Sequence, residues 1–402
     1  MSEVEKKRKF VEEGKTVLNK IKSESGFGLI IYHDDADGIC SGAIAAKMLE
    51  HLGLRYNMVC IEKLFPEVLE LINETKFDFV LFTDIGSGIA SKLPKIIEGD
   101  RRIYVFDHHD AEKSEDPRLI HYNPELHGLS GETVACGATV TYLVAKNLGE
   151  EAKKLAWMAV VGAADIPGKL DHFNWAAFLD ANQVGDVDRR VTAKGESIRV
   201  KVFGKPISYQ SLNRKLTILS SVGYYRDGPQ LAVSSCFFRD LSEVEKKINE
   251  LEKERKIKFN KVMEVIREDG LFALKNVQWF DVEDQFENMG TKTIGTFTSK
   301  IRFQLSLIHN RKYILGFMNM KNIIPGLGQV KGRWKKVSVR VPFRFEELIH
   351  AGVKQPVSAL IVAAAYHNDG YGDGHSVAGS GVVPYENKQS FIETFDSLAG
   401  AK

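Results

Sequence analysis

The sequence lacks the features that mark membrane, secreted and disulfide-bonded proteins. Its 402 residues include only four cysteines, and no two of them have the CxxC spacing of a zinc or redox motif. No apolar run reaches the ~18 residues that cross a bilayer, and the polar N-terminus has the periodicity of a helix, not of a signal peptide. We therefore expect a cytoplasmic protein without a membrane partner.

An excess of charge is missing as well. The formal net charge is +2, which excludes a protein that coats nucleic acid through its overall charge, although a local basic groove is compatible with this value. The hydrophobic share of 44% and the charged share of 27% are ordinary for an enzyme with well-packed cores. At this length we expect two domains.

The first half of the chain alternates apolar segments with helical ones. The segments GLIIY, DFVLF and RIYVF are almost continuously apolar, and helical patterns such as SGAIAAKMLEHLG separate them. Continuous apolar strands between helices are typical of a parallel sheet that is covered on both faces. The sequence therefore predicts an α/β fold whose N-terminal domain is a doubly wound parallel sheet. The later segment TAKGESIRVKVFGKP predicts a hairpin.

A long, highly charged helix is predicted over residues 241–268. Its apolar stripe consists of Val244, Ile248, Leu251 and Ile257. Four later segments, KTIGTFTSKI among them, have strand-like patterns and three have helical patterns, which predicts a smaller α/β domain with a mixed sheet. We expect a catalytic domain over 1–235, a linker helix over 236–268 and a substrate-binding domain over 269–402.

Charged side chains follow three of the predicted strands. HDDADG follows the first, Asp84 the third, and DHHD, residues 107–110, the fourth. Because ligands of open α/β sheets bind beyond the carboxyl ends of the strands, we expect these side chains to converge on one crevice. His33, Asp35 and Asp37 alternate, so an extended backbone would place them on one side and would turn Asp34 and Ala36 away.

Crowded carboxylates in a dry crevice repel one another unless a cation neutralises them. A mixture of imidazoles and carboxylates favours Mn²⁺ over Mg²⁺ or Zn²⁺. With Asp165, at the end of an apolar helical run, the number of ligands fits two ions better than one. Each motif alone also fits a helix cap or a turn, but adjacent His108 and His109 have no such role.

These motifs, in this order, resemble those of the DHH phosphoesterase superfamily. HDDADG, the aspartate of FTD, FDHHD and GAAD resemble its four catalytic motifs, and GYGDGHSVAGSG, residues 370–381, resembles the glycine-rich motif of its DHH-associated C-terminal domain. The sequence departs from that last motif, with GDGH for GGGH and AGSG for AAG. The length, the long helix and the segment HGLSGETVACGATVTYLVA are most similar to archaeal RecJ-like proteins.

The resemblance implies roles for individual residues. One Mn²⁺ would take His33, Asp35 and Asp84, and a second would take Asp37, Asp84, His108 and Asp165, with Mg²⁺ as a substitute. Asp107 would orient His108 through a hydrogen bond, and His109 would face the scissile phosphate. A water activated by the two ions would attack the phosphorus.

The C-terminal domain would hold the substrate. The resemblance implies Arg340 and Ser338, in SVR, as phosphate-binding residues, and the glycine-rich motif adds Gly372, Gly374, His375 and Ser376. The segment KGRWKKVSVRVPFR is basic with one tryptophan, which suits single-stranded nucleic acid, although lysines also protect ordinary sheet edges.

The leading interpretation is therefore a Mn²⁺-dependent exonuclease that hydrolyses single-stranded DNA or RNA to nucleoside 5′-monophosphates. A small-substrate phosphoesterase of the nanoRNase and phosphoadenosine-phosphatase type is the first alternative, with short oligonucleotides as substrates. A scaffold that binds the GINS replication complex is the second, and GINS is also a candidate partner of the nuclease.

Overall fold

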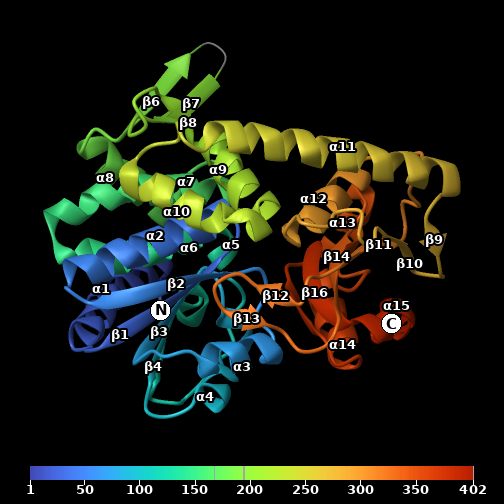
Figure 1. Ribbon diagram of the computed structural model, residues 1–402, viewed down its shortest axis with the longest axis horizontal. Coiled ribbons are helices and arrows are strands. Elements are labelled where there is room, and N and C mark those ends of the chain that lie inside the picture. The colour runs from blue at the N-terminus through green and yellow to red at the C-terminus, as the bar shows by residue number, and fades with distance from the viewer. Residues whose placement is uncertain (167, 193–194, 402) are drawn as a thin grey trace. The chain divides into compact units, whose positions relative to one another are not determined.

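A computed structural model describes residues 1–166, 168–192 and 195–401 (Figure 1). The chain forms two compact units. The first contains residues 1–220, 227–248 and 325–327, and the second contains 221–226, 249–324 and 328–402. Helix α11 (Glu245–Asp269) contributes residues to both units. The domain limits expected from the sequence remain a prediction.

The first unit is built on a five-stranded parallel sheet with the order β2-β1-β3-β4-β5. The strands are β1 (Phe27–His33), β2 (Arg55–Ile61), β3 (Phe79–Thr83), β4 (Arg102–Phe106) and β5 (Leu119–Tyr122). Helices cover both faces of this sheet, with α1, α2 and α6 on one side and α3 and α4 on the other (Figure 1). The predicted doubly wound sheet is confirmed.

The helices of the first unit follow the strands in the expected alternation. They are α1 (Glu3–Lys22), α2 (Ala36–His51), α3 (Pro66–Glu74), α4 (Leu93–Ile96), α5 (Gly131–Val134), α6 (Gly137–Ala145), α7 (Ala156–Gly162), α8 (His172–Gln183), α9 (Tyr209–Thr217) and α10 (Gly228–Phe238). Helix α1 begins with a capping box between Ser2 and Glu5. The segment predicted as a hairpin, residues 192–206, contains β7 (Gly195–Val200), which pairs in antiparallel fashion with β6 (Val187–Thr192) before it and with β8 (Ile207–Ser208) after it; residues 193–194 lie outside the described residues.

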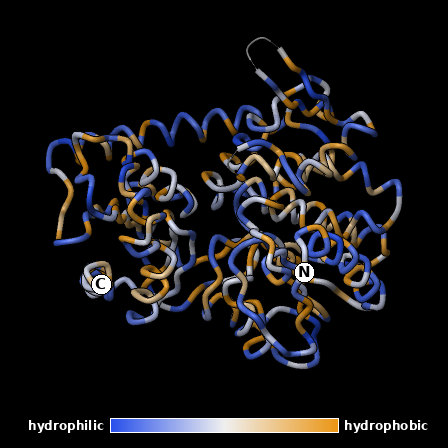
Figure 2. Tube along the Cα trace, turned by 180° about the vertical axis from the view of Figure 1, so that it is seen from behind, coloured by the Kyte–Doolittle hydropathy of each residue, from blue (hydrophilic) through white to orange (hydrophobic). Residues whose placement is uncertain are grey.

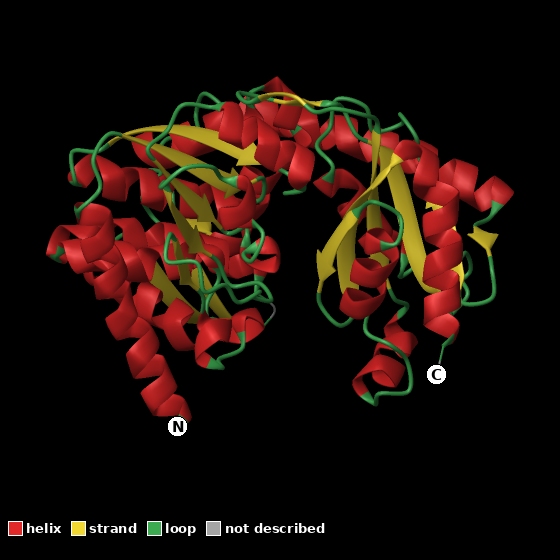
Figure 3. Cartoon of the chain, turned by 90° about the horizontal axis from the view of Figure 1, so that it is seen from below, coloured by secondary structure: helices red, strands yellow, loops and turns green. Residues whose placement is uncertain are grey.

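The second unit contains a mixed six-stranded sheet with the order β15-β16-β14-β11-β10-β9. Only β10 and β11 pair in parallel. The strands are β9 (Phe272–Ala273), β10 (Val277–Asp281), β11 (Tyr313–Asn319), β14 (Trp334–Arg340), β15 (Tyr371–Gly374) and β16 (Ala378–Pro384), and a separate short pair consists of β12 (Ile323–Ile324) and β13 (Gly328–Gln329). Its helices are α12 (Lys292–Ile301), α13 (Phe343–His350), α14 (Val357–Tyr366) and α15 (Lys388–Gly400). The predicted mixed-sheet domain is confirmed, and Figure 3 distinguishes strands from helices in both units.

Two local predictions in this half were wrong. KTIGTFTSKI is not a strand but helix α12, because Ile294, Phe297 and Ile301 recur at helical spacing and are all buried. In α11, Ile257 is 60% exposed, and Phe259 and Val262 are buried farther along the helix instead. The rest of α11 is largely hydrophilic (Figure 2). No helix within the described part of the chain combines the length and the apolar character that crossing a membrane requires.

Candidate metal centre

The candidate site lies where three neighbouring strands of the parallel sheet end. Strand β1 ends at His33, β3 ends one residue before Asp84, and β4 ends one residue before Asp107. The chain goes from β1 to its neighbour β2 on one side and later to β3 on the other, so the strand order reverses at β1. Crevices at such a reversal are the usual ligand sites of open α/β sheets.

The first ligand group consists of His33, Asp35 and Asp84. His33 Nδ1 lies 3.0 Å from Asp35 Oδ2 and 3.7 Å from Asp84 Oδ2, yet this buried nitrogen makes no hydrogen bond with proper geometry to any described residue. Ligands about 2.1 Å from one ion stand about 3 to 4 Å apart and point at the ion, not at one another. The geometry of this group therefore fits a shared cation.

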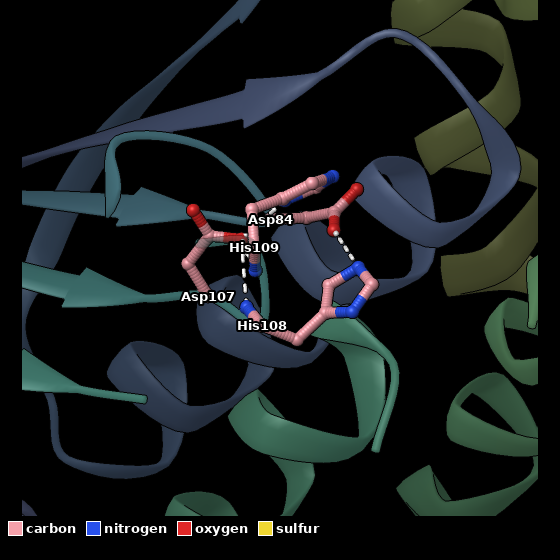
Figure 4. A group of neighbouring side chains, drawn as sticks. All are labelled: Asp84, Asp107, His108 and His109. Atoms are coloured by element: carbon pink, nitrogen blue, oxygen red, sulfur yellow. Dashed lines mark hydrogen bonds and ion pairs between the residues drawn. The ribbon is translucent and has the colours of Figure 1, made fainter. Parts of the chain in front are cut away.

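The second ligand group consists of Asp84, Asp107, His108 and His109, and Figure 4 shows these side chains. His108 Nε2 lies 3.5 Å from Asp84 Oδ1. On the other side of the ring, His108 Nδ1 lies 2.9 Å from the carbonyl oxygen of Gly131, an arrangement that fixes the ring and turns Nε2 towards the carboxylates. Asp84 thus belongs to both groups.

The backbone at Asp84 is unusual. Its φ is 59°, in the left-handed region that non-glycine residues enter at some cost. Its amide N–H donates a hydrogen bond of 2.8 Å to the carbonyl oxygen of Phe106, at the end of β4. The sharp turn after β3 therefore keeps the side chain of Asp84 between the ends of β1 and β4.

Asp107 holds His109 and not, as expected, the ring of His108. Its Oδ1 lies 2.7 Å from His109 Nδ1 and accepts a hydrogen bond of 2.7 Å from the backbone N–H of His108, while Oδ2 accepts one of 2.9 Å from the N–H of Ser87. Burial alone would raise the pKa of Asp107, but the neighbouring His109 and the hydrogen bonds lower it well below its usual range. Burial lowers the pKa of His108, and His109 adds to this shift. A neutral His108 is the form that binds a metal ion.

The other aspartates occupy different environments. Asp37 is buried at the edge of the second group, with Oδ2 3.8 Å from His108 Nε2, and it accepts hydrogen bonds from Gly137 N–H (2.7 Å) and Ala138 N–H (2.8 Å) at the start of α6. Asp165 ends a short 3₁₀ helix (Ala163–Asp165), is exposed, and lies outside both ligand groups as formed by the described residues.

Asp35 and Asp34 combine local and site roles. Asp35 caps α2 through Oδ1, which accepts a hydrogen bond of 3.0 Å from Gly38 N–H, and its other oxygen faces His33. The expectation that Asp34 points away was wrong, because its buried Oδ1 lies 3.3 Å from His33 Nε2. His33 therefore has a carboxylate near each ring nitrogen, Asp35 at Nδ1 and Asp34 at Nε2. Metal-binding histidines commonly have a carboxylate at the nitrogen that does not bind the ion.

Three glycines that the sequence did not single out pack against the ligands. A β-carbon on Gly137 would lie 2.3 Å from Asp84 Oδ1, one on Gly162 would lie 2.3 Å from Asp37 Oδ1, and one on Gly131 would lie 1.7 Å from the carbonyl oxygen of His108. Each of these positions needs glycine because a ligand occupies the space of a side chain. The glycines belong to elements far from the strand ends in sequence, so no local pattern identifies them.

Asn123, Ser87 and His121, which the sequence analysis did not identify, form hydrogen bonds next to the site histidines. Asn123 Nδ2 donates hydrogen bonds to the carbonyl oxygen of His109 (2.9 Å) and to Ser87 Oγ (2.8 Å), and His121 Nε2 lies 2.8 Å from the same hydroxyl. Asn123 is fully buried. It directly follows β5, at the same edge of the sheet as the ligands, and this position is the signal that could have identified it.

The predicted substrate-binding residues lie together in the second unit. Arg340, at the end of β14, donates hydrogen bonds to Ser299 Oγ (2.8 Å), Ser338 Oγ (3.1 Å) and the carbonyl oxygens of Val339 (2.8 Å) and Gly379 (3.2 Å). Burial, and secondly the charge of Arg302, lowers the pKa of Arg340 to about 10.

The glycine-rich motif lies beside Arg340. It is not a loop alone but the hairpin β15–β16, with Gly372 and Gly374 in β15 and with His375 and Ser376 in the connection. Arg340 pairs with Ala378, whose carbonyl oxygen accepts a hydrogen bond of 2.8 Å from His375 N–H. The motif and the arginine therefore lie at one end of the sheet.

The predicted basic strip does not form as expected. Lys335 and Lys336 are buried, and Lys335 Nζ contacts Asp281 Oδ2 and Asn319 Oδ1, both at 2.7 Å. Lys335 is thus paired within the domain, whereas Lys331, Arg333 and Arg344 are exposed, so only part of the expected strip faces solvent.

The protein is thus a two-domain α/β protein, and the side chains at the ends of its parallel strands have the composition and spacing of a metal site. Residues 29–163 match the family described as DHH family, N-terminal domain. The matched residues lie in the first unit and include His33, Asp84 and His108, so this part of the chain is similar to DHH domains, and the two-domain fold is similar to that of RecJ proteins.

An uncharacterized protein of Methanocaldococcus jannaschii is 23% identical in an alignment 452 residues long, which covers 99% of each chain. RecJ from Thermus thermophilus, in complex with Mn²⁺, is 16% identical with a TM-score of 0.63 over 97% of this chain and 55% of that one. CDC45 from Entamoeba histolytica is 10% identical with a TM-score of 0.61, over 98% of this chain and 99% of that one. At such identities the structural likeness shows the fold alone, and this chain spans only about half of the Thermus protein.

Proposed function

We propose that the protein is a cytoplasmic, metal-dependent phosphoesterase of the RecJ-like exonuclease type, which hydrolyses single-stranded DNA or RNA to nucleoside 5′-monophosphates. The observation that carries this proposal is the pair of ligand groups that share Asp84 at the ends of β1, β3 and β4. Two adjacent ions with a common carboxylate are the typical arrangement for in-line displacement at phosphorus.

The ligand groups assign the residues that would hold the ions. His33, Asp35 and Asp84 fit one ion, and Asp84 and His108, with Asp37 beside them, fit the other. Asp165 remains a proposed ligand from the family resemblance. Mn²⁺ is the proposed ion and Mg²⁺ its substitute, a choice supported by the Thermus RecJ structures with Mn²⁺ and with Mg²⁺. When bound, such ions supply Lewis acidity and lower the pKa of a coordinated water.

The side chains around the ions have separable tasks. The ring of His109 is 43% exposed, far more than the 10% of His108, and Asp107 holds it through Nδ1. We assign His109 to the scissile phosphate, because a carboxylate on Nδ1 orients the ring and stabilises its protonated form beside a developing negative charge. Arg340 and Ser338 are the proposed phosphate-binding residues of the second unit, with Gly372, Gly374, His375 and Ser376 beside them.

A second function has one observation in its favour. The likeness to CDC45 extends over 99% of that chain, which supports the alternative of a replication protein that binds a partner such as GINS. The two ligand groups that share Asp84 favour hydrolysis over a purely structural role, because buried carboxylates without an ion reduce stability. Binding to a partner is compatible with hydrolysis.

The test is digestion of 5′-labelled and 3′-labelled single-stranded DNA and RNA with Mn²⁺, with Mg²⁺ and with EDTA. Asp84→Ala is the inactive variant, and Asp100→Ala, at an exposed position outside the centre, is its matched control. We expect metal-dependent shortening by the wild type and by Asp100→Ala, and none by Asp84→Ala. Cleavage of dinucleotides or 3′-phosphoadenosine 5′-phosphate alone would favour the small-substrate branch, and no cleavage at all would refute the proposal.

A further inference from the structure

The second unit exposes two phenylalanines in segments close to the half-buried Arg340 in sequence or through hydrogen bonding. Phe303, just after α12, is 62% exposed, and Phe343, the first residue of α13, is 61% exposed. Their neighbours Ile301 and Phe345 are buried in the same two segments, so the chain has core positions for apolar side chains here and still presents two rings to solvent. Single exposed apolar residues need no explanation, but an aromatic pair in one charged setting does.

An ion pair joins the two segments. Arg302 pairs with Glu346 of α13, and its guanidinium carbon lies 5.0 Å from the centre of the Phe303 ring. Phe343 lies three residues before Glu346 on α13, a spacing that places both on one side of the helix. Phe303, next to Arg302 in the chain, and Phe343, one helical turn before Glu346, thus belong to the two segments that the Arg302–Glu346 ion pair joins.

Basic side chains occur in and near both segments, alongside the acids Glu346 and Glu347 of α13. Arg340 donates a hydrogen bond to Ser299 in the last turn of α12, and the charge of Arg302 is close enough to act on the pKa of Arg340. Among the residues that the structure describes, no carboxylate forms an ion pair with Arg340. Lys300 in α12 and Arg344 in α13 are exposed. Guanidinium groups with hydrogen-bonding capacity but no acid are suited to phosphate.

We propose that Phe303 and Phe343 form a base-stacking site for single-stranded nucleic acid, with Arg340 on the adjoining phosphate. Exposed aromatic rings beside basic groups are the usual platform for unpaired bases, because every base has a face that stacks. This inference rests on the proposed function for its substrate class, and adds to it the side chains that would make long strands preferable to isolated phosphates. With this site, the second unit could bind a strand without Lys335, whose charge is paired with Asp281.

The test compares two fluorescent strands of equal length, an oligothymidylate and an abasic strand with the same phosphates. Binding is measured by anisotropy in EDTA, so that neither strand is cleaved. We expect the wild type to bind the oligothymidylate about 100-fold more tightly, because each of the two rings contributes about tenfold through stacking. Phe303→Ala and Phe343→Ala should each lose about tenfold on this strand, and the double variant should bind both strands equally.

The matched control is Phe272→Ala, which removes a phenylalanine that is 67% exposed on β9 and should leave binding unchanged. The salt dependence should be the same in all variants, because no charge is altered. Equal affinity of the wild type for the two strands, no binding to either, or a double variant that binds like the wild type would overturn the stacking site. The abasic comparison with the wild type needs no variant, so misfolding cannot obscure the result.

Cleavage with Mn²⁺, measured separately on the same proteins, distinguishes the two proposals. If the protein prefers the oligothymidylate but cleaves neither strand, the stacking site is supported and the nuclease proposal is refuted. If it cleaves strands without any preference in binding, the stacking site is refuted and the nuclease proposal is supported.

Discussion

Replacing Gly137 by alanine is the most specific perturbation of the centre that the structure offers. Gly137 is the first residue of α6, and a β-carbon there would lie 2.3 Å from Oδ1, 2.6 Å from Cβ and 2.7 Å from Cγ of Asp84. Non-bonded carbon atoms prefer about 3.5 Å or more, so the Asp84 side chain or the helix must move by about 1 Å. A misplacement of that size costs about 100-fold in rate, and overpacking costs about 1–3 kcal/mol.

The assay separates displaced ligands from a damaged fold. Mn²⁺ binding by calorimetry and hydrolysis of labelled strands report on Asp84, whereas unfolding of the metal-free protein reports on packing. The control is Gly88→Ala, because a β-carbon there would find no described atom within 4 Å. We expect Gly137→Ala to lose Mn²⁺ affinity and about 100-fold in activity, and Gly88→Ala to lose neither. Wild-type Mn²⁺ binding and rate in Gly137→Ala would refute the account of this packing.

Three further changes test other parts of the structure. Asp84→Asn should abolish hydrolysis and lower the number of bound Mn²⁺ ions in calorimetry, since both ligand groups lose a member; two ions bound with wild-type affinity would contradict a shared ligand. Asp281→Asn should lower the free energy of unfolding by about 3–5 kcal/mol in urea, because Lys335 stays buried without its carboxylate. The folded-state pKa of Asp281 is lowered, since the hydrogen bonds of its lysines outweigh burial, so this stability is present above about pH 4 and lost as the pH falls further; an unchanged acid limb in the variant would refute the assignment. Asn123→Ala should reduce activity about 10- to 100-fold with little change in substrate KM, because it positions His109 through its backbone, and a change in KM alone would assign it to substrate binding.

Much of the first unit could be predicted from the sequence because its strands are buried on both faces. A strand such as β3, with five buried residues in a row, leaves an apolar run that is visible without any neighbour. Parallel strands also end at one edge, so the convergence of His33, Asp84 and His108 follows from topology alone. The prediction of a metal centre needed only the order of short motifs and this rule.

The features that failed depend on contacts between distant segments. Thr-rich α12 was predicted as a strand because its β-branched residues favour strands locally, whereas burial of three residues at helical spacing decides for a helix. Ile257 was a different kind of error: nine residues after Ile248, it lies on the opposite side of α11 from Ile248 and Phe259, so its exposure follows from the helical repeat itself. The buried lysine at 335 is neutralised by Asp281, 54 residues away in the chain, which no local charge pattern reveals.

The distribution of hydrogen-bond donors explains how this many acids are kept in one buried place. Asp37 is stabilised by two backbone N–H groups at the start of α6, where the helix dipole also favours negative charge. Asp107 is stabilised by three backbone N–H groups and by the ring of His109. These acids are compensated by the fold itself. Asp84 is different, because imidazole nitrogens approach it from two sides, at 3.7 Å and 3.5 Å, spacings typical of ligands around an ion. The fold therefore fixes the outer carboxylates with backbone groups, and the proposed cations would complete the compensation of charge at Asp84.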